Sequence, residues 1–318
     1  MIKYIFLNAH IQTLFATFYR VEDTPLDHER FTLSDGDFVD CLWYERVLEE
    51  GSHKPIVVLL HGLAGSVESP YIKRAMRELG SMGFSVVLMH FRGCYKEPNL
   101  LARSYHSGEI GDVKEFISYL KDKYRSKLFG VGFSIGGNVL LKFMSHSDSR
   151  ELLSGAVAVS APMDLTLCAN KIEQGFSRLY QQHLLKPLKR QLKYKCKKFD
   201  LKGLIGLDSK EIDAISSFWE FDNRYTAPIH GFKDAKEYYQ LCSSKGDLKD
   251  IVKPTLIIHA KDDPFTGAGV IPKIDEVSTF VTLDIKEHGG HLGFVDGSFF
   301  KPDFWIFKRI GNYLSNLE

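Results

Sequence analysis

LFGVGFSIGGNVLL, residues 128–141, holds two kinds of apolar pattern around a single serine. The part before Ser134 is an apolar run short enough for a buried strand, and the part after it has apolar residues at helical spacing as far as about Met144. The serine stands in a Gly-x-Ser-x-Gly pattern with Gly132 and Gly136, which predicts a strand, a sharp turn and a helix. The two glycines leave no side chain to clash where the strand and the helix cross. Such a turn lifts the Ser134 hydroxyl out of the sheet, where it can act as a nucleophile.

The same glycines could instead belong to a nucleotide-binding loop, but their spacing fits neither common pattern. Gly130, Gly132 and Gly136 place the third glycine one residue too late for Gly-x-Gly-x-x-Gly. A phosphate loop needs Lys after the second glycine of its Gly-x-x-x-x-Gly run, and here Gly137 is followed by Asn138. The pattern therefore favours the nucleophile turn.

The composition describes an ordinary globular protein. The 318 residues can bury a large core, and α/β folds of this size are often one domain with an insertion. With 44% hydrophobic residues, 25% charged residues and a formal net charge of +1, no nucleic-acid partner is expected. The cysteines are odd in number and scattered without a Cys-x-x-Cys pair, which favours free thiols in a reducing, cytoplasmic compartment. They are Cys41, Cys94, Cys168, Cys196 and Cys242.

The first twenty residues are apolar in part, but they match neither a signal peptide nor a membrane-spanning helix. A spanning helix needs about 18 uninterrupted apolar residues. This segment is interrupted by Asn8, His10, Gln12 and Thr13. We therefore expect a short amphipathic segment that packs on the body of the protein.

Along the rest of the chain, strand and helix patterns alternate. Residues 31–44 alternate around Asp35-Gly36, which predicts an antiparallel hairpin. The strands expected after it are 56–60, 84–89, 128–133, 155–160, 254–260 and 280–285, and the expected helices are 70–80, 107–124, 135–144 and 303–314. This order predicts an α/β fold with a mostly parallel, doubly wound sheet.

The alternation stops between residues 161 and 253, where the pattern is helical, rich in aromatic residues and basic in its middle. Insertions of this kind often cover the mouth of a site. The predicted organisation is therefore a core made of residues 1–160 and 254–318, with 161–253 as a helical cap inserted into it.

A nucleophilic serine needs a base for its proton and a third group that holds the tautomer of the base. Where the serine stands on a strand-to-helix turn, as in α/β hydrolases, these partners follow in the order Ser, acid, His. His291 is the preferred base, because it lies in a glycine-rich loop after the last strand, where its side chain can reach the turn. His288 stands nearer the strand end and is expected to be an exposed loop residue.

The acid is expected just after the strand that ends at Ala260. Asp263 stands three residues beyond Ala260 and is preferred, while Asp262 is the fallback with a role in the turn as its alternative. Two backbone N–H groups are expected to bind the oxyanion. One belongs to Ile135, directly after the nucleophile, and the other to Leu63, in the glycine-containing loop after the strand 56–60.

Seven further stretches resemble one family, the bacterial YheT-like α/β hydrolases, and together they run nearly from end to end of the chain. They are residues 8–13 (NAHIQT), 61–71 (HGLAGS with SPY), 90–94 (HFRGC), 105–109 (YHSGE), 229–232 (IHGF), 259–265 (HAKDDPF) and 287–294 (EHGGHLGF). Eukaryotic relatives of this family include acylglycerol lipases and yeast medium-chain fatty-acid ethyl ester esterases and synthases. The resemblance implies that Ser134, Asp263 and His291 form the charge relay, and it implies a mechanism more firmly than a substrate.

The middle of the insertion, residues 186–198, is more basic than we expect for such a family. Its basic residues are Lys186, Lys189, Arg190, Lys193, Lys195, Lys197 and Lys198, with no acidic residue among them. A solvated face of the cap is the simpler interpretation. The alternative is peripheral contact with an anionic membrane, where about 1 kcal/mol per basic residue is available. The aromatic residues nearby are more typical of a core, although some must line any pocket that the cap closes; they are Phe176, Tyr180, Tyr194, Phe199, Phe218, Trp219 and Phe221.

These observations predict a serine carboxylester hydrolase that forms an acyl-enzyme on small-molecule acyl esters of short to medium chain. An acyltransferase that passes the acyl group to an alcohol, and a binding protein without activity, stay open as alternatives. No metal or organic cofactor is expected, because the sequence has no His-Glu-x-x-His and no histidine or cysteine pair at ligand spacing. An epoxide or haloalkane hydrolase would need Asp in place of Ser134. The sequence does not predict an oligomeric state.

Overall fold

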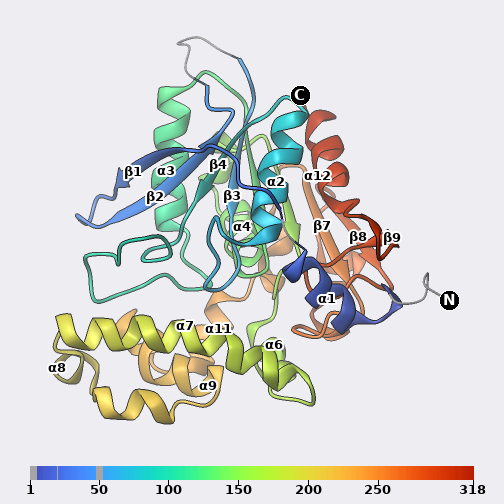
Figure 1. The fold of residues 1–318 in the computed structure, drawn as a ribbon. Helices are drawn as coiled ribbons and strands as arrows, with labels where there is room; N and C mark the ends of the chain where they lie inside the picture. Colours follow the sequence, from blue (N-terminus) through green and yellow to red (C-terminus); the bar gives the residue numbers. More distant parts are fainter. Residues whose placement is uncertain (1–5, 20, 48–52) are drawn as a thin grey trace.

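The computed structural model describes residues 6–19, 21–47 and 53–318, and a sheet of eight strands lies at its centre. The strands are β1 (Asp27–Thr32), β2 (Phe38–Tyr44), β3 (Ile56–Leu60), β4 (Ser85–Met89), β5 (Leu128–Phe133), β6 (Gly155–Val159), β7 (Thr255–Ala260) and β8 (Val281–Lys286). Their order in the sheet is β1-β2-β4-β3-β5-β6-β7-β8 (Figure 1). The β1–β2 and β2–β4 pairs are antiparallel and the other pairs are parallel. The predicted α/β fold is confirmed.

The central strands are buried on both faces, which explains their continuous apolar sequence. Successive side chains of a strand point to opposite faces. In β3, Ile56, Val58 and Leu60 belong to one hydrophobic cluster, and Val57 and Leu59 belong to the other. All five are at most 1% exposed.

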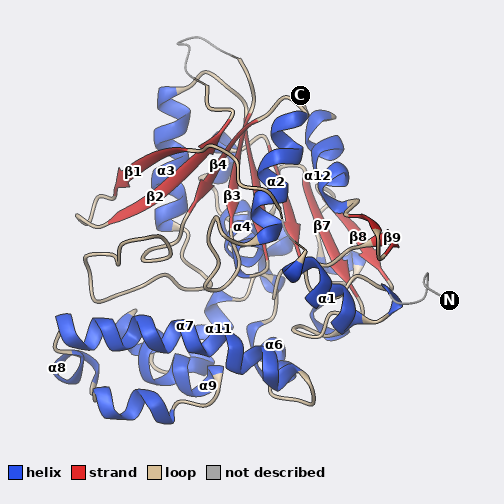
Figure 2. Cartoon of the chain, in the orientation of Figure 1, coloured by secondary structure: helices blue, strands red, loops and turns tan. Residues whose placement is uncertain are grey.

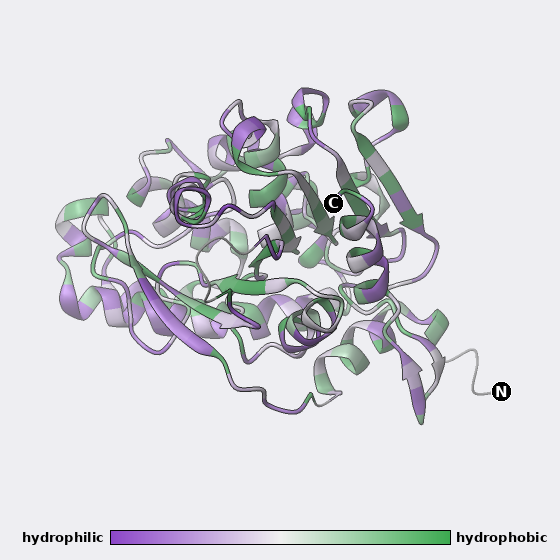
Figure 3. Cartoon of the chain, turned by 90° about the horizontal axis from the view of Figure 1, so that it is seen from above, coloured by the Kyte–Doolittle hydropathy of each residue, from purple (hydrophilic) through white to green (hydrophobic). Residues whose placement is uncertain are grey.

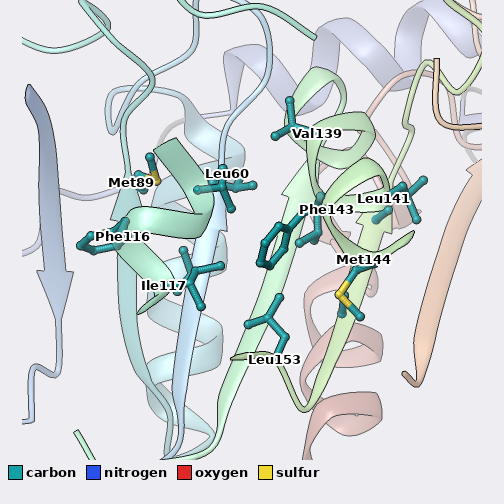
Figure 4. Close-up of a cluster of buried hydrophobic side chains, with 14 of the residues drawn as sticks. Leu60, Met89, Phe116, Ile117, Val139, Leu141, Phe143, Met144 and Leu153 are labelled. Carbon is teal, nitrogen blue, oxygen red and sulfur yellow. The ribbon is translucent and has the colours of Figure 1, made fainter. Parts of the chain in front are cut away.

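Helices cover both faces of the sheet (Figures 1 and 2). They are α2 (Pro70–Ser81), α3 (Gly111–Lys123), α4 (Ile135–Ser145), α5 (Ser149–Leu152) and α12 (Ile306–Ser315). Side chains of α3 and α4 pack with Leu60 on one face, as the cluster around Phe116 and Phe143 shows (Figure 4). Side chains of α2 and α12 pack with Leu59 on the other face. In Figure 3, the hydrophobic colour gathers on the central strands and much of the hydrophilic colour lies at the periphery.

Two predicted helices begin later than expected. Helix α3 begins at Gly111 instead of residue 107, because the preceding loop is held by contacts with the insertion, such as the hydrogen bond from the Ser107 amide to the Tyr238 hydroxyl. Helix α12 begins at Ile306 instead of residue 303. A small hairpin that the sequence analysis missed, β9 (Asp296–Ser298) with β10 (Lys301–Asp303), occupies the residues before it. The hairpin predicted around Asp35-Gly36 forms as β1 and β2.

The amphipathic segment near the N-terminus forms helix α1 (Ala9–Phe18), although residues 1–5 and 20 of the predicted segment lie outside the described residues. The side chain of Asn8 caps the helix by accepting hydrogen bonds from the His10 and Ile11 amides. The guanidinium of Arg74 on α2 donates to the carbonyls of Ala16 and Tyr19. As expected, the segment packs on the body of the protein.

Between β6 and β7 the chain forms a group of helices at one end of the sheet (Figures 1 and 2). They are α6 (Leu165–Ile172), α7 (Ser177–Lys198), α8 (Leu201–Ile205), η2 (Ser209–Ala214), α9 (Phe218–Phe221), η3 (Asp222–Thr226), α10 (Ala227–Ile229), α11 (Ala235–Cys242) and η4 (Lys245–Asp250). Two short 3₁₀ turns follow β7, η5 (Ala268–Val270) and η6 (Ile274–Glu276). Residues 161–253 are called the insertion below. The insertion has apolar clusters of its own, one built on Leu185, Leu188 and Leu192 of α7, and Leu63 of the core packs against that cluster.

Candidate active site

Ser134 stands on the sharp turn between β5 and α4, as the Gly-x-Ser-x-Gly pattern predicts. Its backbone has φ 52° and ψ −121°, a conformation that residues other than glycine rarely adopt and that occurs at functional sites. The Ser134 amide donates to the Val159 carbonyl at 2.8 Å, which holds the turn. A Cβ on Gly132 would collide with the Gly136 backbone, and a Cβ on Gly136 would collide with the Leu60 carbonyl. Both glycines are therefore needed for the close crossing of strand and helix.

The side chains of Ser134, His291 and Asp263 form one hydrogen-bonded line. Nε2 of His291 lies 2.9 Å from Oγ of Ser134, and Nδ1 of His291 lies 2.8 Å from Oδ2 of Asp263. With the Nδ1–H donating to the carboxylate, Nε2 is left to accept the serine proton. The ring of Phe265 stacks on the imidazole with centroids 4.0 Å apart and planes 7° apart, and this contact holds its orientation.

The two neighbouring aspartates have different contacts. Asp263 is 1% exposed, and its second oxygen accepts a hydrogen bond from the Phe265 amide at 2.8 Å. Asp262 accepts hydrogen bonds from the amides of Gly289 and Gly290, both at 3.0 Å, and its other oxygen lies 3.1 Å from Nδ1 of the exposed His288. Asp262 thus holds the backbone of the histidine loop, while Asp263 contacts the imidazole itself.

The two residues whose amides are expected to bind an oxyanion, Leu63 and Ile135, both line the cavity beside Ser134. On the loop after β3, the Gly62 amide donates to the Tyr71 hydroxyl and the Ala64 amide to the Tyr105 hydroxyl, each at 2.8 Å. Within the described part of the chain, the amides of Leu63 and Ile135 have no acceptor. Buried amides are normally paired, so these two donors are suited to bind an anionic oxygen.

A cavity of about 570 Å³ opens onto Ser134 and His291. Residues from the core loops, α1 and the insertion line it. Leu179, Leu184 and Leu188 of α7 contribute apolar surface, as does Phe18 of α1. Of the seven aromatic residues singled out from the sequence, four line the cavity and are Phe176, Tyr180, Phe218 and Phe221. The volume and the apolar lining are typical of a small-molecule site.

Comparison with known proteins agrees with this fold. A family model described as the alpha/beta hydrolase fold matches residues 55–298, which is most of the chain. The chain belongs to the α/β-hydrolase fold family. The resemblance to YheT-like proteins is also confirmed. This α/β hydrolase is 40% identical to YheT of Escherichia coli (strain K12), and the match covers 98% of this chain and 91% of that protein. The name of the E. coli protein proposes an esterase.

Two more distant proteins are also similar to this α/β hydrolase. One is medium-chain fatty acid ethyl ester synthase/esterase 2 of Saccharomyces cerevisiae (strain ATCC 204508 / S288c). It is 28% identical to this chain, and the match covers 83% of this chain and 62% of the yeast protein. The solved structure of the Pyrococcus furiosus esterase Pf2001 is 17% identical with a TM-score of 0.58, over 94% of this chain and 96% of that one. At this identity the structural likeness supports the fold alone.

Sequence reasoning missed one part of the site in this α/β hydrolase, the contact of α1 with the histidine loop. The hydroxyl of Thr13 accepts a hydrogen bond from the His291 amide at 2.9 Å, and Oε1 of Gln12 accepts one from the Val295 amide at 2.7 Å. Both side chains are at most 5% exposed. Two polar residues inside an otherwise apolar segment were the available signal, because a buried polar side chain needs a partner.

The structure corrects the prediction that the basic residues of 186–198 form one exposed face. Lys195 is 4% exposed, and its Nζ donates to the Asn99 side chain and to the carbonyls of Leu101 and Arg103 at 2.7–3.1 Å. Burial lowers the pKa of this ammonium to about 8. The ammonium of Lys189 also has partners, because it donates hydrogen bonds to two backbone carbonyls of the insertion. The residues that remain exposed are Lys186, Arg190, Lys193, Lys197 and Lys198.

In the described ranges no group of three His, Cys, Asp or Glu side chains is arranged to hold a metal ion. All five cysteines are free thiols, and three of them are buried. Every helix of the described chain is too short or too polar to span a membrane.

Proposed function

We propose that this α/β hydrolase cleaves carboxylic esters with Ser134 as the nucleophile. The observation that supports this most is the line of hydrogen bonds from Ser134 through His291 to Asp263, on a strand-to-helix turn beside a largely apolar cavity. The name of the E. coli protein supports an esterase as well.

In the proposed reaction, Nε2 of His291 takes the Ser134 proton while Oγ attacks the ester carbonyl carbon. The carbonyl oxygen becomes an oxyanion that the amides of Leu63 and Ile135 stabilise. The imidazolium, stabilised by Asp263, gives its proton to the leaving alcohol, and the acyl group stays on Ser134. Water then repeats the sequence: His291 takes its proton, the hydroxide attacks the acyl carbon, and the carboxylic acid leaves as the proton returns to Ser134.

We propose that the insertion acts as a cap and that its apolar lining, together with α1, binds the acyl chain. Leu184 and Leu188 are four residues apart on α7, so they present one apolar face to the cavity, and Leu179 lines the cavity from the first turn of the helix. A cavity of about 570 Å³ is suited to esters of short to medium acyl chain. The five free thiols suit a reducing compartment, and we propose the cytoplasm.

The experiment is a series of p-nitrophenyl esters from acetate to palmitate, together with labelling of the protein by a fluorophosphonate probe. We expect covalent labelling at Ser134 and the highest kcat/KM between butyrate and decanoate. A protein that stays unlabelled while a control esterase reacts would favour a binding role without catalysis. Peak turnover on palmitate would contradict the short- to medium-chain proposal. Ethanol added to the same assays separates hydrolysis from acyl transfer, because a transferase would form ethyl ester in place of free acid.

We further propose that the exposed basic residues of 186–198 contact an anionic membrane. Lys186, Arg190, Lys193 and Lys197 are spaced four, three and four residues apart, so they lie along one face of α7. Each such charge is worth about 1 kcal/mol near an anionic surface. Lys193 contributes less, because it pairs with Asp213 at 2.6 Å.

The test is sedimentation with vesicles that contain phosphatidylserine. Replacing Lys186, Arg190 and Lys197 together by Gln should weaken binding about 100-fold, since three charges worth about 1 kcal/mol each are lost. The matched control replaces Lys96, Lys121 and Lys308, three exposed lysines of the core, and should bind as the wild type does. Equal binding to vesicles of phosphatidylcholine alone would contradict the proposal.

A further inference from the structure

One end of the cavity is polar, in contrast to the apolar surface along α7. Asp222 is the one acidic side chain among the described residues that line the cavity, and no Lys or Arg lines it. The polar residues of this end come from the loop before α3 and from η3 and α11 of the insertion. They are Ser104, His106, Ser107, Asp222, Tyr225, Thr226, Tyr238 and Tyr239. A carboxyl group at the wall of a largely apolar cavity costs free energy unless it is hydrogen-bonded or paired with a charge.

Asp222 has hydroxyl neighbours but no cation. The Tyr239 hydroxyl donates to its Oδ2 at 2.7 Å, and the Thr226 hydroxyl is its other hydrogen-bonding neighbour. No Lys or Arg stands among the described residues that line the cavity with it. Burial raises the pKa of this carboxyl to about 6, despite the two hydroxyls, which lower it. The carboxyl therefore retains capacity to accept a further hydrogen bond from a group in the cavity.

The local backbone places Asp222 in this position. It begins η3, a π-helical turn between α9 and α10, and π-turns inside helices are frequent at functional sites. The turn gives the cavity Asp222, Tyr225 and Thr226 from one short segment.

A short chain of contacts connects Asp222 to the serine turn. Asn138, one turn along α4 from Ser134, donates to the Ser107 carbonyl at 2.8 Å. The Ser107 side chain accepts a hydrogen bond from the Tyr238 hydroxyl at 2.7 Å. The rings of Tyr238 and Tyr239 lie 5.3 Å apart, and Tyr239 contacts Asp222. Asp222 and the reacting side chains Ser134 and His291 line the same cavity.

We propose that Asp222 accepts a hydrogen bond from a free hydroxyl group on the alcohol part of the ester and so determines which esters are preferred. The inference rests on the proposed esterase activity. An ester has an apolar acyl half, which suits the α7 side of the cavity, so its alcohol half would occupy the polar end. A phosphate on that half would meet a carboxyl and no Lys or Arg, which argues for a neutral alcohol bearing hydroxyls.

The experiment compares pairs of octanoate esters that differ only in a hydroxyl and a methyl group. The pairs are 2-hydroxyethyl with propyl octanoate, 3-hydroxypropyl with butyl octanoate, and 4-hydroxybutyl with pentyl octanoate, all below their solubility limits. The wild type should prefer the hydroxyl ester by about tenfold in kcat/KM for at least one pair, because a buried acceptor would lose its donor with the methyl analogue.

The variants are Asp222→Leu, which removes both acceptor oxygens, and Asp222→Asn, which keeps one. Asp222→Leu should abolish the preference for the hydroxyl ester, and Asp222→Asn should retain part of it. Asp213→Leu, at an exposed carboxylate of the same insertion, is the matched control and should leave the preference unchanged.

The outcomes distinguish a failure of the proposed esterase activity from a failure of the proposed role of Asp222. If the wild type turns over no ester of the series, the proposed function fails and this inference fails with it. If the wild type turns over both members of every pair equally, or if a folded Asp222→Leu variant keeps the wild-type preference, the ester activity stands and the role of Asp222 is wrong. If Asp222→Leu does not fold, the preference of the wild type and its partial loss in Asp222→Asn decide the question.

Discussion

Replacement of Ser134 by alanine is expected to lower kcat for a p-nitrophenyl ester by at least about 10⁴-fold, because the variant has no oxygen that can form the acyl-enzyme. The backbone should survive this change. The turn is held by the hydrogen bond from the residue 134 amide to the Val159 carbonyl, and alanine keeps that amide. The loss should therefore appear in kcat, with little change in KM or in melting temperature.

The comparison variant is Ser81→Ala, at an exposed serine whose hydroxyl donates to the Glu78 carbonyl within the same helix. It should keep wild-type turnover and wild-type labelling by a fluorophosphonate. Residual activity of Ser134→Ala within about tenfold of the wild type would show that another group attacks the ester, because the donors at Leu63 and Ile135 alone supply only a small part of such catalysis.

The parts of this fold that the sequence predicted correctly are those in which local pattern and global packing agree. The run Ile56–Leu60 is apolar at every position, and only a strand buried on both faces satisfies that pattern in a short segment. At the serine turn, Gly132 and Gly136 reflect close backbone crossings that no larger residue permits. The expected positions of His291 and Asp263 followed from the order Ser, acid, His and from their places in the loops after the last two strands of the sheet.

The features that the sequence did not predict depend on contacts between residues far apart in the chain. Thr13 supports the His291 loop across 278 positions of the sequence, and no periodicity reports such a partner. In the sequence, Lys195 is one more basic residue of a basic helix. In the structure it is buried, and its ammonium donates to carbonyls of the loop after β4. Local propensity does not encode these tertiary constraints.

The adjacent aspartates provide the second large expected effect. Replacing Asp263 by asparagine keeps the shape of the side chain, but it removes the charge that stabilises the His291 imidazolium and the acceptor that fixes its tautomer. We expect kcat to fall by about 10³- to 10⁴-fold with a small change in KM. The same replacement at Asp262 should lower kcat by less than about tenfold. One oxygen of Asp262 accepts hydrogen bonds from the amides of both Gly289 and Gly290, and the single oxygen of an asparagine can still do so.

The pair of variants is informative because the two residues are neighbours on one loop, so general damage to the loop would affect both. Thermal unfolding monitors that damage, and we expect the two melting temperatures to lie close together. A larger loss of kcat in Asp262→Asn than in Asp263→Asn would assign the orienting role to Asp262. That result would require the His291 loop to rearrange during catalysis, because in the structure Asp262 contacts His288 and the loop backbone while Asp263 lies 2.8 Å from His291.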